Sequence, residues 1–314
     1  MSLVIDGLRK RFGDVQALDG VTFAIRPGEV YGFLGANGAG KTTTMRIVLG
    51  FLKPDAGTVT WMGEPARSWP RKTWGYMPEE RGLYLRMPVL EQLVYYASLY
   101  GVPRGTARKA ALDWLARFRI SEYANRKAES LSKGNQQKVQ YIATILHDPD
   151  VILMDEPFAG LDPVNVALLK SAFVEMRDRG KTLVFSTHQL DQAEELCDSV
   201  AIVDHGRIVT AGQTRDVKRS TGHQVVRFAT AGDGDLAWLR TLPNVTVTRP
   251  GNDYTELRVD TGTDPQTVLR AAIARGGDVL RFEVADPSLE EVFVERVGKL
   301  DVEERTLAAA EARS

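Results

Sequence analysis

The feature that most constrains the fold of this chain is the stretch FLGANGAGKTTTM, where a short apolar run gives way to glycines, a lysine and threonines. Gly35, Gly40, Lys41 and Thr42 have the GxxxxGK[ST] spacing of a phosphate-binding loop. Glycines allow backbone angles that other residues avoid, so consecutive N–H groups can point toward one anion. The helix that follows adds the positive end of its dipole. The loop therefore predicts an α/β fold with a nucleotide site between a strand and a helix.

Within this loop we expect the backbone amides to surround the phosphates of a nucleoside triphosphate. Lys41 is expected to lie across the outer phosphates, and the hydroxyl of Thr42 to bind the magnesium ion that the nucleotide brings. A chance match to the spacing is the alternative, and its probability is about one per cent for a chain of this length. The residues expected to bind the nucleotide here are Gly35, Asn37, Gly38, Ala39, Gly40, Lys41, Thr42 and Thr43.

The composition is that of a globular protein large enough for two domains, with 314 residues, 43% hydrophobic and 26% charged. A formal net charge of -1 provides no general attraction to nucleic acid or anionic lipid. Cys197 is the single cysteine, which excludes disulfides within the chain and favours a reducing compartment. No window approaches about 18 uncharged apolar residues, so we expect a chain that neither crosses a membrane nor is exported.

Apolar segments separated by turn residues predict the order of the elements. Strands are expected at 4–5, 21–25, 30–34, 58–61, 74–77 and 182–187. The residues after the loop, Thr43 to Leu49, predict a helix. Amphipathic spacing then predicts helices at 89–99, 107–118 and 132–145. The stretch from about 80 to 146 is therefore expected to be a helical subdomain.

Two acids follow an apolar run in VILMDEP, residues 151–157, which predicts a buried parallel strand whose carboxylates emerge at the end that faces a ligand. Asp155 is expected to hold magnesium through its water shell, together with Thr42. Glu156 is the next residue, so its side chain points in a different direction from that of Asp155. It is the expected general base for an attacking water; a helix-capping or solvated acid is the alternative. His188 stands at the end of another buried strand, where its position alone favours neither a structural nor a functional role.

The segment LSKGNQQ, residues 131–137, lies ahead of the two acids, and with it the chain resembles the ATP-binding subunit of an ATP-binding cassette (ABC) transporter. The resemblance covers about residues 1–218 and implies a P-loop NTPase cassette, a mixed sheet with a RecA-like core and a helical subdomain. The motifs occur in the family's order: Walker A at 35–42, the signature at 131–135, Walker B at 151–156, the D-loop at 159–162 and the switch histidine at His188.

The resemblance implies ATP and Mg²⁺ as cofactors and assigns further residues to the nucleotide site. Phe12 takes the place of the aromatic residue that stacks on adenine, with a core phenylalanine as the alternative. Ser132 and Gly134 would contact the γ-phosphate bound to an opposing subunit, and Asp162 of the D-loop belongs to the same site. His188 would sense the γ-phosphate and join Glu156 in catalysis.

This chain departs from the family's usual pattern at two places. Lys133 and Asn135 replace glycine and glutamine of the usual LSGGQ signature, while the two positions that contact phosphate are kept. Glu79 stands where the family usually has glutamine, and its carboxylate can still meet magnesium or a water bound to it. The variants LSKGN and PEERGLY are similar to those of the branch with separate six-helix permeases, which includes sodium, drug and antibiotic exporters.

A second domain is expected at residues 219–298. Strands at 225–228, 245–247, 255–259 and 279–284, with helices at 235–242 and 265–275, predict a small α+β ferredoxin-like domain. It holds no glycine cradle and no metal-spaced His or Cys set, and it resembles the accessory domain of many drug-exporter ATPases. We expect a role in self-association or regulation. The tail at 299–314 is expected to be a solvated helix or disordered.

The whole sequence thus predicts an ATPase that dimerises head to tail around two ATP molecules, as a homodimer or heterodimer, and powers a separate transmembrane permease. Its cargo would be a drug, antibiotic, lipid-like molecule or ion, and export is the expected direction. The expected location is cytoplasmic, peripheral at the inner face of the cell membrane, with contact to the membrane only through the permease. The permease is expected to dock between Glu79 and Tyr100, at Tyr84 and Leu85; packing inside the helical subdomain is the alternative for these two residues.

Two other functions fit the sequence less well. A soluble cassette ATPase acting on DNA or ribosomes is the main alternative, but proteins of that class tend to carry coiled-coil insertions, CxxC zinc motifs or two cassettes, and this chain has none of them. No binding to nucleic acid is therefore expected. A nucleotide sensor with little turnover is disfavoured by the presence of Glu156 and His188.

Overall fold

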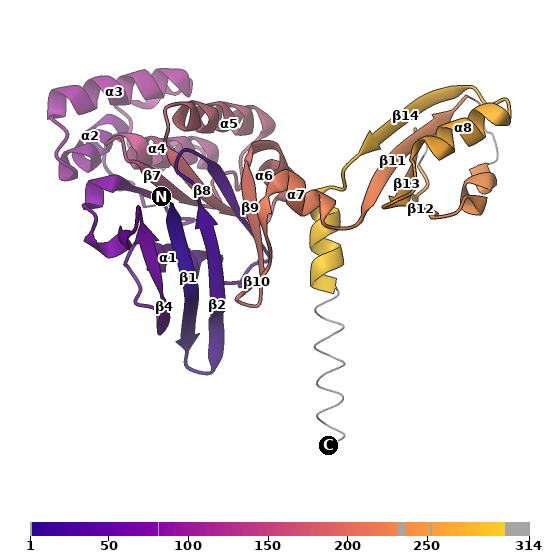
Figure 1. The fold of residues 1–314 in the computed structure, drawn as a ribbon. Coiled ribbons are helices and arrows are strands. Elements are labelled where there is room, and N and C mark those ends of the chain that lie inside the picture. The colour runs from indigo at the N-terminus through magenta and orange to yellow at the C-terminus, as the bar shows by residue number, and fades with distance from the viewer. Residues whose placement is uncertain (1, 81, 232–235, 252, 299–314) are drawn as a thin grey trace. The chain divides into compact units, whose positions relative to one another are not determined.

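The computed structural model describes residues 2–80, 82–231, 236–251 and 253–298. It divides the chain into two compact units, Met1–Gly212 and Gln213–Ser314 (Figure 1). The strands of the first unit are β1 (Leu3–Phe12), β2 (Val15–Ile25), β3 (Val30–Leu34), β4 (Ala56–Trp61), β5 (Glu64–Pro65), β6 (Trp74–Met77), β7 (Val151–Asp155), β8 (Thr182–Thr187), β9 (Ser199–Asp204) and β10 (Arg207–Gln213). Its helices are α1 (Lys41–Val48), α2 (Val89–Leu99), α3 (Arg104–Arg117), α4 (Lys133–Ile145), α5 (Pro163–Asp178) and α6 (Leu190–Leu196).

The strands of the first unit form two sheets. A six-stranded sheet has the order β10-β9-β3-β8-β7-β6, in which β3 runs parallel to β8 and β9, and β7 runs parallel to β6 and β8. A four-stranded antiparallel sheet has the order β2-β1-β4-β5. The predicted α/β fold with a mixed P-loop NTPase architecture is confirmed. Because β3, β7 and β8 are parallel neighbours, the chain leaves all three at the same edge of the sheet.

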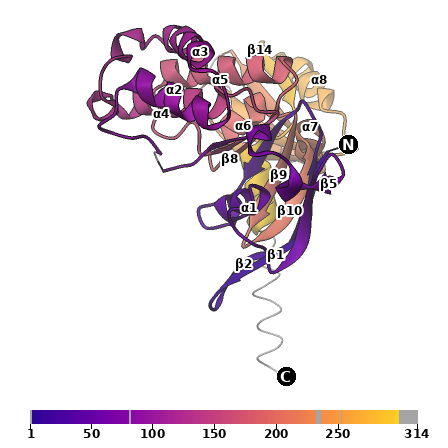
Figure 2. The ribbon, with the colours of Figure 1, turned by 90° about the vertical axis from the view of Figure 1, so that its left-hand side faces the viewer.

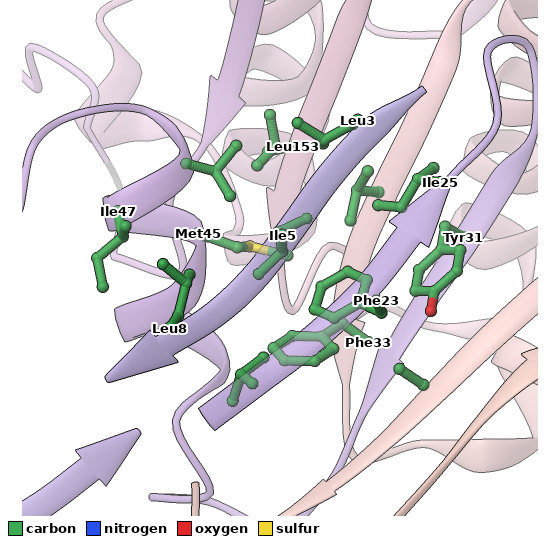
Figure 3. Close-up of a cluster of buried hydrophobic side chains, with 14 of the residues drawn as sticks. Leu3, Ile5, Leu8, Phe23, Ile25, Tyr31, Phe33, Met45, Ile47 and Leu153 are labelled. Carbon is green, nitrogen blue, oxygen red and sulfur yellow. The ribbon is translucent and has the colours of Figure 1, made fainter. Parts of the chain in front are cut away.

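The core of the first unit lies between the two sheets and α1 (Figure 3). Strands β3, β7 and β8 are buried along their whole length, which explains why they read as continuous apolar runs. The ring of Phe23, from β2, stacks on Tyr31 and Phe33 of β3 at centroid distances of 5.4 and 5.1 Å. Met45 and Ile47 add the apolar side of α1 to the same cluster. This packing holds the start of α1 against the end of β3.

Several strands are longer or more numerous than the sequence pattern predicts. β1 and β2 form a hairpin that continues past the apolar segments at 4–5 and 21–25 into polar residues. There Leu8 and Leu18 still pack into the core, and Arg9 and Asp19 add a cross-strand ion pair. The sequence analysis predicted neither β9 nor β10, although β9 is apolar and is buried except at its last residue, Asp204.

The helices expected at 89–99, 107–118 and 132–145 correspond to α2, α3 and α4, which lie together on one side of the first unit (Figure 2). α3 begins three residues before its expected start, directly after Pro103, because proline suits a helix start, where no backbone hydrogen bond is lost. Tyr141 of α4 stacks on Phe173 of α5 with a centroid distance of 5.8 Å and contacts Phe118 edge-on. These buried aromatic contacts anchor α4 to the core.

The second unit contains α7 (Thr214–Arg219), β11 (His223–Thr230), β12 (Val245–Arg249), β13 (Thr255–Asp260), α8 (Gln266–Ala274), β14 (Val279–Ala285) and a helical stretch at 289–298. Its antiparallel sheet has the order β12-β13-β11-β14, which matches the expected ferredoxin-like connectivity. The helix expected at 235–242 is a 3₁₀ segment, Leu236–Thr241, a form that suits such a short piece. The tail at 299–314 lies outside the described residues.

Among the described residues, no helix is both long enough and apolar enough to cross a membrane. Cys197 is buried against Gly32, where burial raises the pKa of its thiol well above the usual value. A thiol in that environment stays protonated and acts as a packing group.

Candidate nucleotide-binding site

The phosphate-binding loop joins the end of β3 to the start of α1, and its glycines are required by both backbone angle and space. Gly38 and Gly40 have φ angles of 85° and 105°, in the left-handed region. A Cβ at Gly40 would lie 2.6 Å from a methyl carbon of Leu18, and one at Gly35 would lie 2.3 Å from the carbonyl oxygen of Val203. Only glycine therefore fits at positions 35 and 40, and the loop stays close to the sheet behind it.

Lys41, the first residue of α1, is buried and turns its ammonium group back over the loop. Nζ donates hydrogen bonds to the carbonyl oxygens of Gly35 at 2.7 Å and Ala36 at 3.1 Å, and lies 3.8 Å from Oε1 of Glu156. Burial lowers the pKa of Lys41, and the carboxylates of Glu156 and Asp155 oppose that shift. The cation is thus held at the loop without full solvation, where an anionic ligand would stabilise its charge.

Asp155, at the end of β7, is buried and accepts hydrogen bonds from two hydroxyl groups. Thr42 Oγ1 donates to Oδ2 at 2.6 Å, and the hydroxyl of Ser186 donates to Oδ1. Ser186 lies opposite Asp155 because β7 and β8 pair in parallel register. The hydroxyl and carboxylate oxygens form a hard donor set of the kind that suits Mg²⁺. Within the described residues, no group of three or more His, Cys, Asp or Glu could hold a metal ion, so such an ion would need phosphate or water oxygens as further ligands.

Glu156 follows Asp155 with a φ of 48°, an uncommon conformation for a residue other than glycine. Its N–H donates to the carbonyl oxygen of Ser186 at 3.1 Å. The side chain is 5% exposed; Oε2 accepts from Thr187 Oγ1 at 3.2 Å, and Oε1 is 2.9 Å from Nδ1 of His188. These contacts are not those of a solvated acid or a helix cap. They orient a carboxylate beside a histidine, an arrangement that can accept a proton.

A cleft of about 190 Å³ brings together residues from the loop, from the end of β7 and from the segment after β6. Its lining consists of Ala17, Asn37, Gly38, Gly40, Lys41, Thr42, Thr43, Glu79, Asp155 and Glu156. A second cleft of about 270 Å³ shares Thr42, Glu79 and Asp155 with the first. Positions far apart in the sequence therefore converge on one place, whereas Ala39, within the loop, is buried.

The remaining expected site residues do not line this cleft. Phe12 lies at the end of β1 and is 49% exposed, with the ammonium of Lys10 5.5 Å from its ring centroid, so it is not a core phenylalanine. Ser132 and Asp162 cap the starts of α4 and α5, accepting backbone N–H groups at 3.3 and 3.0 Å. A Cβ at Gly134 would lie 3.4 Å from Leu161, so the starts of these two helices are neighbours.

The position of Asp162 at the start of α5 also lowers the pKa of its carboxyl group. The backbone N–H of Asn165 donates to its carboxylate, and this hydrogen bond is the largest cause that lowers the pKa of Asp162. The group formed by Ser132, Gly134 and Asp162 thus presents two helix N-termini and an ionised carboxylate. One chain therefore has the phosphate-binding loop and the two acids in one place, and the N-termini of α4 and α5 in another.

Comparison with known proteins decides the family. The model of the family "ABC transporter" matches residues 18–159, and that of the "ATP-binding protein DrrA1-3-like, C-terminal domain" matches residues 212–297. The ABC transporter ATP-binding protein YhaQ of Bacillus subtilis is 42% identical over 296 residues, which cover 94% of this chain and 98% of YhaQ. This chain belongs to the ATP-binding proteins of ABC transporters.

Two further comparisons agree with this family. The Nod factor export ATP-binding protein I of Ralstonia nicotianae is 37% identical over 244 residues, which cover 76% of this chain and 75% of that protein. A solved ATP-binding subunit of an ABC transporter has a TM-score of 0.66 and 31% identity, and the match covers 71% of this chain and 94% of that one. The ABC protein described here is accordingly an ATP-binding ATPase with relatives in export systems.

The structure of this ABC ATPase also reveals contacts that sequence reasoning missed. Gln140 of α4 donates to the carbonyl oxygens of Pro78 at 2.7 Å and Glu80 at 3.3 Å, on either side of Glu79. Gln137 donates to the carbonyl oxygen of Pro157 at 3.0 Å, just after the two acids. The signal in the sequence was weak, since it consists of glutamines on the buried side of an amphipathic helix. Through these two glutamines, α4 contacts the segment around Glu79 and the residue that follows Asp155 and Glu156.

Proposed function

We propose that this ABC ATPase dimerises around two ATP molecules and drives a separate transmembrane permease that works as an exporter. The observation that carries the proposal is the separation of two groups within one chain. The cradle with its acids lies in the cleft, whereas Ser132, Gly134 and Asp162 lie at the starts of α4 and α5 and do not line it. A second chain, in a homodimer or heterodimer, would bring its helix N-termini to the phosphates of the first.

In this proposal the loop amides and Lys41 bind the phosphates, and Phe12 stacks on the adenine. Thr42 and Asp155 hold Mg²⁺, with Glu79 at its edge, because their oxygens already lie together at the cleft. When bound, the ion would neutralise charge on the outer phosphates. The loop amides and Lys41 would thus contribute hydrogen-bond donors and positive charge, and Thr42, Asp155 and Glu79 would contribute metal ligands.

Glu156 is the proposed general base. It is buried, oriented by Thr187 and His188, and close to Lys41, so its carboxylate is held in place before the nucleotide arrives. It would accept a proton from the water that attacks the γ-phosphate. His188, half exposed at the end of β8, would donate a hydrogen bond to the γ-phosphate from the same position.

A surface of exposed aromatic and aliphatic side chains supports the proposed permease contact. Tyr84 is 53% exposed although its ring stacks on Tyr96 at a centroid distance of 5.7 Å, and Leu85, Tyr95 and Leu99 are exposed as well. Packing within the helical subdomain thus accounts for only part of the Tyr84 surface. Aromatic residues of this kind act as anchors for an apolar partner, and we propose a cytoplasmic helix of the permease.

The contacts made by Gln140 suggest how docking would reach the nucleotide. The docking residues follow Glu80, whose carbonyl oxygen Gln140 holds, and Glu79 lines the nucleotide cleft. Movement of this segment would therefore change the position of Glu79. The family relationship and the export role named for a relative support a place at the inner face of the cell membrane, where the permease would export a drug, antibiotic, lipid-like molecule or ion.

The test is to purify the tagged chain from detergent-solubilised membranes, identify the membrane protein that accompanies it, and measure ATPase activity with and without that partner in vesicles. We expect the partner to stimulate hydrolysis. Alanine at both Tyr84 and Leu85 should abolish stimulation and leave basal activity unchanged, whereas Leu112→Ala, an exposed apolar control on α3, should retain it. An ATPase that binds no membrane protein, or full stimulation of the double variant, would contradict the proposal.

A further inference from the structure

Ser186 is the residue of β8 that lies directly opposite Asp155 in the parallel register of β7 and β8. Both residues are buried, with 0% of Ser186 and 1% of Asp155 exposed. A serine hydroxyl without access to solvent has to find its hydrogen-bond partners inside the protein. The partners that the structure gives it belong to the two acids, Asp155 and Glu156.

The hydroxyl of Ser186 contacts both acids at once. It donates its hydrogen to Oδ1 of Asp155, because a carboxylate can only accept. Oγ in turn accepts the backbone N–H of Glu156 at 3.3 Å, and the carbonyl oxygen of Ser186 accepts the same N–H at 3.1 Å. A chain of hydrogen bonds thus runs from the Glu156 amide through the hydroxyl to the Asp155 carboxylate.

The hydrogen bond to Ser186 determines how Asp155 can use its two oxygens. Oδ1 is occupied by Ser186, and Oδ2 accepts from Thr42 Oγ1 at 2.6 Å. With Oδ1 held, the carboxylate cannot rotate freely, and Oδ2 stays beside the Thr42 hydroxyl. Mg²⁺ demands near-ideal octahedral geometry, so ligands that are already held in place favour its binding.

Ser186 also supports the backbone of Glu156, whose φ of 48° is uncommon for a residue other than glycine. Such a conformation persists only where the surrounding structure holds it. Two acceptors on Ser186 hold the Glu156 N–H, while Thr187 and His188 contact its side chain. The direction in which the Glu156 side chain leaves the end of β7 therefore depends partly on Ser186.

We propose that Ser186 is a positioning residue for ATP hydrolysis, because it fixes Asp155 for the metal ion and Glu156 for the attacking water. This role rests on the function proposed above, in which Asp155 holds Mg²⁺ and Glu156 is the base. Ser186 does not line the nucleotide cleft, so it acts through the two acids rather than on the nucleotide directly.

Binding of fluorescent ATP, titrated with Mg²⁺ and repeated in EDTA, tests the metal site without any need for turnover. Ser186→Ala should raise the Mg²⁺ concentration at half-maximal binding roughly tenfold, as expected when a metal ligand loses its hydrogen-bond partner. Binding without metal should be unchanged, because the loop amides and Lys41 are untouched. In phosphate-release assays at saturating Mg²⁺, kcat should also fall about tenfold.

Matched variants separate the hydroxyl from the shape of the side chain. Ser186→Thr and Ser186→Val have nearly the same shape, so strain from the added methyl groups is common to both, and only threonine keeps the hydroxyl. The threonine variant should need within about threefold of the parent's Mg²⁺ concentration, and the valine variant roughly tenfold more than the threonine variant. Thr187→Ala removes a hydroxyl that contacts Glu156 rather than Asp155, so it should lower kcat and leave the Mg²⁺ requirement unchanged.

A double-mutant cycle shows whether Ser186 acts through Asp155. Asp155→Asn alone should raise the Mg²⁺ requirement, and adding Ser186→Ala should change it less than about twofold, because the carboxylate that the serine holds is already gone. A parent-like requirement in Asp155→Asn would contradict the metal site of the proposed function. If Asp155→Asn responds as expected, the role of Ser186 alone would be overturned by a parent-like Ser186→Ala, by equal threonine and valine variants, or by the same Ser186→Ala effect on both backgrounds.

Discussion

Replacing Glu156 by glutamine should separate ATP binding from ATP hydrolysis. The substitution keeps the shape of a side chain that is 5% exposed. In the parent, the Glu156 carboxylate lies 3.2 Å from Thr187 Oγ1 and 2.9 Å from Nδ1 of His188. The side-chain oxygen of glutamine can still accept from Thr187, and its NH₂ group can face Nδ1 of His188. The local structure should therefore persist, at a cost of about 1 kcal/mol or less in folding free energy. What is lost is the ability to accept a proton.

The expected size of the catalytic defect follows from that loss. General-base assistance contributes about 100-fold to 10,000-fold to a rate, which corresponds to roughly 3 to 5 kcal/mol on the activation barrier. ATP affinity should be unchanged or higher, because the loop amides, Lys41 and Thr42 are untouched and one negative charge next to the phosphates is removed. Asp155→Asn should differ, since it weakens the proposed metal site and therefore both binding and hydrolysis.

Phosphate release under saturating MgATP measures the rate, and size-exclusion chromatography with ATP measures the oligomeric state. We expect Glu156→Gln to form a long-lived ATP-dependent dimer, because unhydrolysed γ-phosphates bridge each cradle to the opposing Ser132 and Gly134. Lys41→Ala on the same background should abolish this dimer. Hydrolysis at the parent rate would show that Glu156 is not the base. An inactive variant that stays monomeric with ATP would remove the main support for a two-chain site.

Changes at His188, in the second unit and at His147 provide three further checks. His188→Ala should reduce turnover far more than ATP affinity, measured by steady-state kinetics and nucleotide titration, and an equal loss of both would indicate a structural role. A chain that ends near Lys218 should still bind fluorescent ATP, with defects confined to dimer lifetime or stability; a folded truncation that cannot bind nucleotide would refute this. His147 stacks on Tyr100, and burial lowers its pKa below the usual 6.5. As the pH falls through 6.5 the unfolded chain therefore takes up the proton first. The free energy of unfolding, measured in urea, should then decrease toward acid pH more steeply for the parent than for His147→Gln, and identical slopes would exclude the effect.

The sequence by itself determined the features that depend on short spacings. The loop from Gly35 to Thr42 binds phosphate through successive backbone amides, so its chemistry depends on consecutive residues. The acid pair Asp155 and Glu156 follows one buried strand, and the helices of the subdomain follow from their apolar period. The connectivity of the second unit could be read in the same way, from alternating strands and turns.

Only the tertiary structure decided which distant residues meet. Ser186 faces Asp155, and Thr187 and His188 face Glu156, because β7 and β8 pair in one parallel register. Gln140 reaches the segment around Glu79 across 62 residues of sequence. The register of two strands and the side of a helix that faces a loop depend on packing of the whole unit, which no local pattern contains. For the same reason the sequence predicted an alternating strand at 279–284 but not its place at an edge of the sheet, where Leu280 and Val284 are exposed.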